Sequence, residues 1–157
     1  MSAPAPPDPV ALSLWSQIAL VATGGAVGAA LRFGAVEGLA AIGDRHGLPW
    51  RTTAVNIVGS GALGVLLGVM ATHRVAPSPE GVAAGAGEAW RLLLAVGLLG
   101  SFTTFSTFSH ENWTLWREGR ALAALGHAGL SVLLCLLAAA AGALLAERLF
   151  GSGRAGV

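Results

Sequence analysis

Four long stretches without Asp, Glu, Lys or Arg dominate this 157-residue chain. They run from Val10 to Leu31, Thr52 to Thr72, Leu92 to Ser109 and Ala121 to Ala146, which is 22, 21, 18 and 26 residues. A helix needs about 20 residues to cross a hydrocarbon layer of about 30 Å. Because lipid offers the backbone no hydrogen-bond partner, such stretches without strict alternation indicate helices rather than barrel strands. The sequence therefore predicts an all-α membrane protein with four transmembrane helices.

The predicted organisation is one transmembrane domain over residues 10–149, with spans at about 10–32, 52–72, 91–109 and 121–147. Residues 1–9 are rich in proline and lack the basic residues of a cleaved signal, so we expect a disordered tail there. Residues 75–89 predict a flexible loop and residues 150–157 a flexible C-terminal tail. The five tryptophans lie at or near the edges of the uncharged stretches, which is typical of the membrane interface.

Composition excludes several classes of protein. Hydrophobic residues make up 54% of the chain and charged residues only 11%, whereas soluble domains carry about 25% charged residues. With a net charge of +1, the chain offers no basic surface for nucleic acid. The single cysteine, Cys135, excludes an internal disulfide. His110-Glu111 begins like a zinc-protease motif but lacks the second histidine, so we predict no enzyme.

The arginines give almost no signal for orientation in the membrane. Four of them (Arg74, Arg91, Arg148 and Arg154) fall on the side of the two termini. The opposite loops also carry four (Arg45, Arg51, Arg117 and Arg120), or five with Arg32. An arginine excess normally marks the cytoplasmic side. Its near absence favours insertion in both orientations, which permits an antiparallel homodimer; the alternative is one orientation fixed by other factors.

The second stretch places small and polar residues on one helical face, because Thr52, Asn56, Ser60, Gly64 and Gly68 recur every four residues. We interpret the glycines, like the pair Gly24-x-x-x-Gly28 in the first stretch, as sites of close helix packing. Asn56 differs, since an amide in the bilayer must satisfy its N–H donors. It either joins two helices or faces a path for water or ions.

The third stretch is a poor uniform helix because Gly97–Ser109 (GLLGSFTTFSTFS) holds two glycines and six hydroxyl residues. We predict a break near Gly100 to Thr104. Carbonyls freed inside a membrane suit a hard monovalent cation, although a simple kink is the alternative. If the helix resumes, Phe105 and Phe108 face the same way, and their positive ring edges suit an anion unless the pair is ordinary packing.

The fourth stretch carries His127, Ser131 and Cys135 at intervals of four, which indicates either a row of hydrogen-bond donors or helix packing. No Asp or Glu lies within the four stretches. This absence argues against a proton-coupled antiporter that works through an intramembrane carboxylate.

Three segments together resemble the Fluc, or CrcB-type, fluoride channels. They are Gly24 to Phe33 (GGAVGAALRF), Thr52 to Gly64 (TTAVNIVGSGALG) and Gly97 to Glu111 (GLLGSFTTFSTFSHE). The third segment with Asn56 upstream is the most specific part of the match. Three positions depart from the family pattern as we know it: Cys135 in place of serine, Ser101 in place of glycine and Phe33 in place of tyrosine.

The resemblance implies an antiparallel homodimer of four-helix subunits with two pores and a central structural sodium ion that is not transported. The backbone carbonyls of Gly100 and Thr103 would hold the sodium. The edges of Phe105 and Phe108 would line the pores, and Asn56 would donate to fluoride. Further donors would be Thr52, Ser106, Thr107 and Ser131. Arg32 would attract anions at the entrance, or else be an arginine whose charged group reaches the interface.

The function that follows is a passive, fluoride-selective channel in a bacterial-type inner membrane, which exports fluoride and lowers its toxicity. Its partners would be fluoride, a second copy of the chain and the lipid bilayer. Two alternatives remain open at this stage: a small dual-topology exporter of drugs or organic cations, and a structural membrane subunit that transports nothing.

Overall fold

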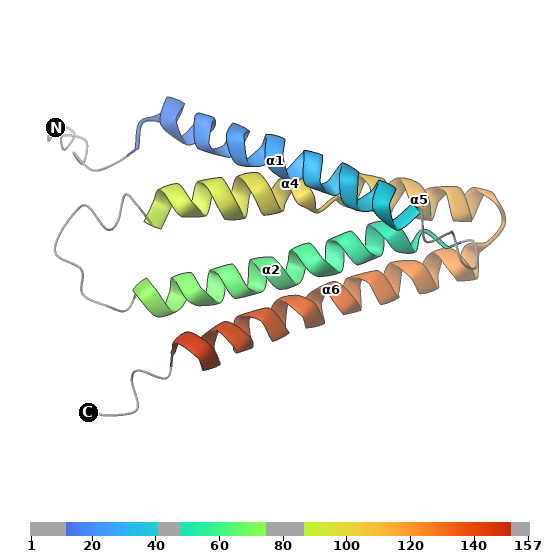
Figure 1. Cartoon of the computed structure of the whole chain (residues 1–157). Coiled ribbons are helices and arrows are strands. Elements are labelled where there is room, and N and C mark those ends of the chain that lie inside the picture. The colour runs from blue at the N-terminus through green and yellow to red at the C-terminus, as the bar shows by residue number, and fades with distance from the viewer. Residues whose placement is uncertain (1–11, 41–47, 75–86, 152–157) are drawn as a thin grey trace, which may run out of the picture.

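The computed structural model describes residues 12–40, 48–74 and 87–151, and every regular element in those ranges is a helix. In chain order the elements are α1 (Leu14–Ala40), α2 (Trp50–Arg74), η1 (Arg91–Leu99), α4 (Gly100–Phe102), α5 (Phe105–Arg117) and α6 (Ala121–Phe150). The elements η1, α4 and α5 follow one another as a single interrupted rod beside the other three helices (Figure 1). Four segments are long and apolar enough to cross a membrane: Leu14–Ala40, Trp50–Thr72, Gly87–Arg117 and Ala121–Phe150. The chain is therefore a multi-pass membrane protein.

Two helical spans extend well past the C-terminal ends of the uncharged stretches that predicted them. Helix α1 continues past residue 32 to Ala40, and the third candidate span continues past residue 109 to Arg117. A charged side chain ends an uncharged stretch without ending the helix, because helix propensity differs little between charged and apolar residues. One consequence concerns Glu111, which lies inside the third candidate span although no uncharged stretch contains a carboxylate.

The predicted tails and loop fall mostly outside the described residues, namely at 1–9, 75–86 and 152–157. The last three residues of the predicted loop at 75–89 are helical instead, because a helical turn already covers residues 87–90.

Glycines allow the helices to pack closely in two pairs, α1 with η1 and α2 with α6, which make the most extensive contacts. A Cβ atom added at Gly28 would overlap the carbonyl oxygen of Leu98 in η1. One added at Gly64 would overlap the carbonyl oxygen of Ala139 in α6. The interpretation of these glycines as packing sites is confirmed. Gly28 of α1 packs against η1, whereas Gly64 of α2 packs against α6.

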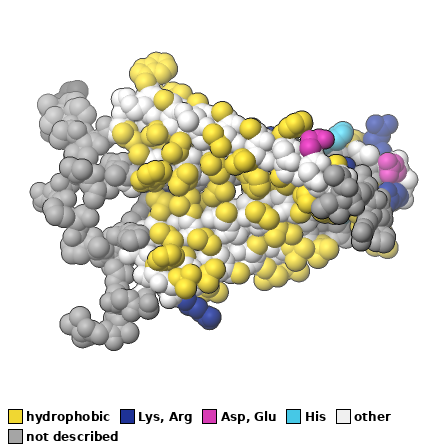
Figure 2. Space-filling view, in the orientation of Figure 1, with side chains coloured by type: hydrophobic (Ala, Val, Ile, Leu, Met, Phe, Trp, Pro, Cys, Tyr) yellow, Lys and Arg dark blue, Asp and Glu magenta, His cyan; other side chains and the backbone are white. Residues whose placement is uncertain are grey.

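Large apolar side chains lie mainly on the outside of the bundle. Leu122 is 85% exposed and Trp15 is 78% exposed. Among the described residues the buried polar or charged side chains are Thr52, Thr104, His127 and Ser131. Figure 2 shows hydrophobic side chains spread over the middle of one face, with most charged and histidine side chains gathered where α1 ends and α5 meets α6. This pattern is typical of a surface that faces lipid.

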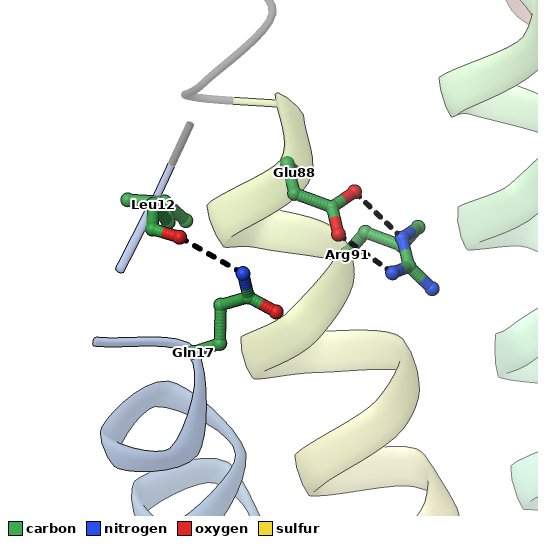
Figure 3. Close-up of polar contacts among 4 residues, drawn as sticks. All are labelled: Leu12, Gln17, Glu88 and Arg91. Atoms are coloured by element: carbon green, nitrogen blue, oxygen red, sulfur yellow. Dashed lines mark hydrogen bonds and ion pairs between the residues drawn. The ribbon is translucent and has the colours of Figure 1, made fainter. Parts of the chain in front are cut away.

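Two local polar contacts lie near the starts of α1 and η1 (Figure 3). Gln17 Nε2 donates a hydrogen bond of 2.9 Å to the Leu12 carbonyl at the start of α1. Arg91, the first residue of η1, binds both carboxylate oxygens of Glu88 at 2.7 and 2.8 Å. Both contacts are local in sequence.

Candidate functional site

The third helix is interrupted at Thr103 and Thr104, inside the segment where the sequence predicts a break. Their backbones are extended, with φ/ψ of −80°/157° and −147°/119°. Helix α5 then begins, and Thr104 caps it, because Thr104 Oγ1 accepts a hydrogen bond of 3.3 Å from the backbone N–H of Thr107. At the break one helix therefore ends and a new helix, capped by Thr104, begins, so the break is more than a kink.

Asn56 of α2 satisfies the backbone at this break. Its Nδ2 donates to the Thr104 carbonyl at 3.0 Å, and the Thr104 N–H donates to its Oδ1 at 2.8 Å. In a continuous helix the Thr104 N–H would bond to the carbonyl of Gly100, four residues earlier. Because that N–H turns toward Asn56 instead, the Gly100 carbonyl loses its helical partner. The sequence left two roles open for Asn56. The structure shows the first of them, because Asn56 joins α2 to the third helix.

Asn56 also has a second side-chain N–H group that the Thr104 carbonyl does not use. An amide nitrogen carries two N–H groups, and the described residues take one of them, through Thr104. Asn56 lines a groove of about 290 Å³ beside the break. The second N–H is thus available to a small acceptor in that groove.

The groove brings together residues from α2, the broken third helix and α6. Its walls are Asn56, Ser60, Leu63, Thr103, Thr104, Phe105, Phe108, Ser131, Val132, Cys135 and Leu136. Five of the predicted site residues are among them: Asn56, Thr103, Phe105, Phe108 and Ser131. Amide, hydroxyl and aromatic groups thus meet in one place, and no acidic side chain is among these lining residues.

The two phenylalanines sit together at the start of α5. Their ring centroids are 5.4 Å apart, with the ring planes tilted by 40°. Phe105 is 76% exposed, whereas Phe108 is partly covered and has its ring 5.8 Å from that of His127. A large aromatic side chain this exposed beside a groove that contains amide and hydroxyl groups is either at a lipid surface or at an interface with another chain.

A second, wider cavity of about 640 Å³ holds three other predicted site residues, Arg32, Thr52 and Thr107. Thr52 is buried there and donates a hydrogen bond of 2.5 Å to Glu111 Oε1. The charged and histidine side chains that line this cavity are Arg32, Arg51, His110, Glu111, Glu118 and Arg120. The cavity thus brings several charged side chains together with apolar ones at the charged end of the bundle, and Thr104 lines both it and the groove.

Two predicted site residues line neither space. Ser106 is exposed, and its Oγ lies 3.2 Å from Thr104 Oγ1. Gly100 is exposed at the start of α4. The fold thus divides the predicted site residues between the groove, the wide cavity and the surface beside the break.

A chain of hydrogen bonds across three helices was missed by sequence reasoning. Thr53 Oγ1 lies 2.9 Å from His127 Nε2 and 2.8 Å from Ser131 Oγ. On the other side of the ring, His127 Nδ1 lies 3.1 Å from Asn112 Oδ1. Thr53 and Asn112 could have been suspected, because polar residues in membrane helices need partners. Which of these residues pair with His127 depends on how the helices are aligned with one another, and a short sequence motif does not determine that alignment.

Comparison with known proteins places the chain in a family. Residues 19–143 match the family model described as "CrcB-like protein, Camphor Resistance (CrcB)". A relative from Hyphomonas neptunium named "Fluoride-specific ion channel FluC" is 48% identical over 134 residues, covering 83% of this chain and 95% of the relative.

Two more relatives with the same printed name extend this result. The protein from Phenylobacterium zucineum is 44% identical over 133 residues, covering 83% of this chain and 95% of its own length. The protein from Caulobacter vibrioides is 38% identical over 139 residues, covering 86% of this chain and 98% of its own length. With the family model spanning all four membrane helices, this chain belongs to the CrcB-like family.

Proposed function

We propose that this protein is a passive, fluoride-selective ion channel of the bacterial inner membrane, which lets fluoride leave the cytoplasm and so lowers its toxicity. The observation that carries the proposal is the groove beside the helix break, where an amide donor, hydroxyls and phenyl rings share one space without an acidic side chain among the lining residues. The names of the three relatives support the same function.

The chemistry of the groove suits a small, strongly hydrated anion. Burying an isolated ion costs tens of kcal/mol by an idealised estimate, so a pore must replace the lost hydration. Hydroxyl and amide donors make short contacts with fluoride, and the positive edges of aromatic rings add to them. Chloride is larger, so it makes longer contacts with the same donors and gains less from them. The donors that we assign to fluoride are Asn56, Ser131, Thr52, Thr107 and Ser106, with Phe105 and Phe108 supplying ring edges and Arg32 attracting anions at the entrance.

The working form is an antiparallel homodimer. The groove is open on one side, and Phe105 beside it is 76% exposed. Lipid cannot satisfy the polar groups of the groove, whereas a second copy can cover them and supply its own rings. The near balance of arginines between the two sides permits the two copies to insert in opposite orientations. Two such copies would form two pores.

A structural sodium ion fits the break in the third helix. The Gly100 carbonyl has lost its helical N–H partner to Asn56, and the carbonyl of Thr103 follows an extended backbone. Carbonyl oxygens are suitable ligands for a hard monovalent cation. Bound there, sodium would add a fixed positive charge beside the groove. We expect replacement of sodium by N-methylglucamine to reduce dimer stability in size-exclusion chromatography, while an unchanged dimer would contradict this assignment.

No energy source is needed for export. A negative cell interior drives an anion outward by about 2.3 kcal/mol per charge for each 100 mV. A selective open path is therefore sufficient to lower the internal concentration of fluoride.

The proposal is tested by fluoride efflux from vesicles. Purified protein is reconstituted into liposomes loaded with potassium fluoride, valinomycin balances the charge, and an electrode records external fluoride. We expect efflux far above that of protein-free vesicles, with little chloride efflux from matched chloride-loaded vesicles. Efflux no faster than that of empty vesicles from well-folded protein would end the proposal and would leave a structural, non-transporting subunit as the better interpretation.

One observation favours a second candidate, a dual-topology exporter of drugs or organic cations. Glu111 lies inside the third candidate span and binds Thr52 beside the wide cavity. A carboxylate within a membrane helix is what a cation exporter requires. Uptake of a labelled quaternary ammonium into the same vesicles, abolished by Glu111→Gln, would support the exporter. Fluoride efflux without such uptake would exclude it.

A further inference from the structure

We propose that His127 is a positioning residue that sets the direction of a chain of hydroxyl hydrogen bonds, so that protonation of its ring frees the Ser131 hydroxyl to donate to an anion in the groove. The inference rests on the proposed fluoride function. It deepens that function by identifying a proton-dependent donor within the site.

The position of one proton follows from Asn112. Its side-chain nitrogen is identified by its partner, because Nδ2 lies 2.7 Å from the Phe108 carbonyl, which can only accept. The atom that faces His127 Nδ1 at 3.1 Å is therefore the amide oxygen Oδ1. Since Oδ1 can only accept, Nδ1 carries the hydrogen of the neutral ring, and Nε2 is left as an acceptor.

The neutral ring then fixes both hydroxyl groups beyond it. Nε2 must accept from Thr53 Oγ1, which lies 2.9 Å away. A hydroxyl has one hydrogen, so Thr53 accepts from Ser131 Oγ at 2.8 Å. The hydrogen of Ser131 is thereby engaged within the protein. Ser131 lines the groove, where its oxygen offers only lone pairs to an anion.

Protonation of His127 reverses this order. Nε2–H now donates to Thr53, and the Thr53 hydrogen turns to the oxygen of Ser131. The Ser131 hydrogen is then released toward the groove, where it becomes a donor for the anion. The proton comes from solvent, and only the hydrogen positions change along the chain. The step requires no movement of a helix.

No acidic side chain is among the described residues that line the groove. The ionisable groups of the helices that pack against α6 at this level are Arg51 of α2 and His110 and Glu111 of α5. All three line the wide cavity, to which His127 does not contribute. Its ring is hydrogen-bonded to Asn112 and Thr53 and lies beside the Phe108 ring.

The first test measures fluoride efflux at about pH 5.5 and about pH 8, on either side of the ordinary histidine range. Vesicles have equal pH inside and outside, contain fluoride below half-saturation, and are corrected for leakage of hydrogen fluoride from protein-free vesicles. One added hydrogen bond to an ion is equivalent to about a tenfold change in affinity. We expect wild-type efflux to be about tenfold faster at the acidic pH.

Three variants separate the hydrogen-bond chain from simpler effects. His127→Gln should reduce the ratio of acidic to basic efflux to about one. Ser131→Ala should do the same although His127 can still be protonated, because the hydrogen that is released is missing. His110→Gln is the matched control and should keep the wild-type ratio. A wild-type ratio near one, or a ratio that survives in either His127→Gln or Ser131→Ala, would overturn the proposal.

The second test does not depend on conduction. In nitrogen-15 NMR of histidine-labelled protein in lipid, chemical shifts distinguish a protonated ring nitrogen from a bare one. At about pH 8 we expect the His127 signals, identified by their loss in His127→Gln, to show a proton on Nδ1 and none on Nε2. A proton on Nε2 would refute the hydrogen-bond order. If the protein conducted no fluoride, this measurement would still decide the order by itself.

Discussion

Replacement of Asn56 by Asp is the sharpest perturbation of the proposed pore, because it changes hydrogen-bond character and charge with almost no change of shape. A carboxylate oxygen can still accept from the Thr104 N–H, as Oδ1 does at 2.8 Å. The other oxygen would face the Thr104 carbonyl, to which Nδ2 now donates at 3.0 Å. The variant thus keeps one of two contacts, loses both N–H donors and places a negative charge in the groove.

The expected size of the effect follows from these changes. A hydrogen bond to a charged group contributes about 1.5–3 kcal/mol. Two like charges about 4 Å apart repel by about 4 kcal/mol at an effective dielectric constant of about 20. Together these terms oppose fluoride by about 5.5–7 kcal/mol, and each 1.4 kcal/mol is equivalent to about a tenfold change in rate. We therefore expect Asn56→Asp to slow fluoride efflux by about ten-thousandfold or more.

The assay is electrode-detected efflux from liposomes at about pH 8, with size-exclusion chromatography to verify folding. Gln17→Glu is the matched control, since it makes the same amide-to-acid change near the start of α1, where Gln17 bonds to the Leu12 carbonyl and lines neither the groove nor the wide cavity. Its efflux should stay close to that of the wild type. If well-folded Asn56→Asp conducted within about twofold of the wild type, the groove would not be the path of the anion.

Three further outcomes are expected. Phe108→Ile should slow fluoride efflux while the dimer still elutes intact, and unchanged efflux would remove this ring from the pore. Gly28→Val should lower thermal stability by about 1–3 kcal/mol, since its Cβ overlaps the Leu98 carbonyl, whereas Gly34→Val meets nothing within 4 Å and serves as the control. Thr104→Ala should cost about 1 kcal/mol through the lost cap of α5, measurable as a lower unfolding midpoint, and Thr104→Ser should restore most of it.

Much of the architecture could be predicted because lipid imposes a simple rule on the sequence. Long uncharged stretches must be helices in a membrane, and four candidate spans are present. The break in the third helix was also foreseeable, since glycine and hydroxyl residues weaken a helix at Gly100 to Thr104. The close approaches at Gly28 and Gly64 follow from residue size alone.

The grouping of side chains was harder to predict because it depends on helix alignment. Thr52 and Thr53 are adjacent in sequence, yet Thr52 binds Glu111 and Thr53 binds His127 and Ser131. Neighbouring residues on a helix point about 100° apart, so a single residue decides which partner helix is met. The helix ends were also misjudged, because charge ends an uncharged stretch but not a helix. Glu111 therefore lies deeper in the third span than the stretches implied.

The proposed assembly and the proposed conduction depend on the same surface. Around the groove, exposed apolar residues such as Leu136 and Val132 are compatible with lipid, whereas the second N–H of Asn56 is a donor that lipid cannot satisfy. A second copy that only buried this surface would leave that donor without a partner, at a cost of about 1–3 kcal/mol. An anion between the copies satisfies it. Fluoride should therefore stabilise the dimer as well as pass through it, and dimer dissociation that is insensitive to fluoride would separate the pore from the interface.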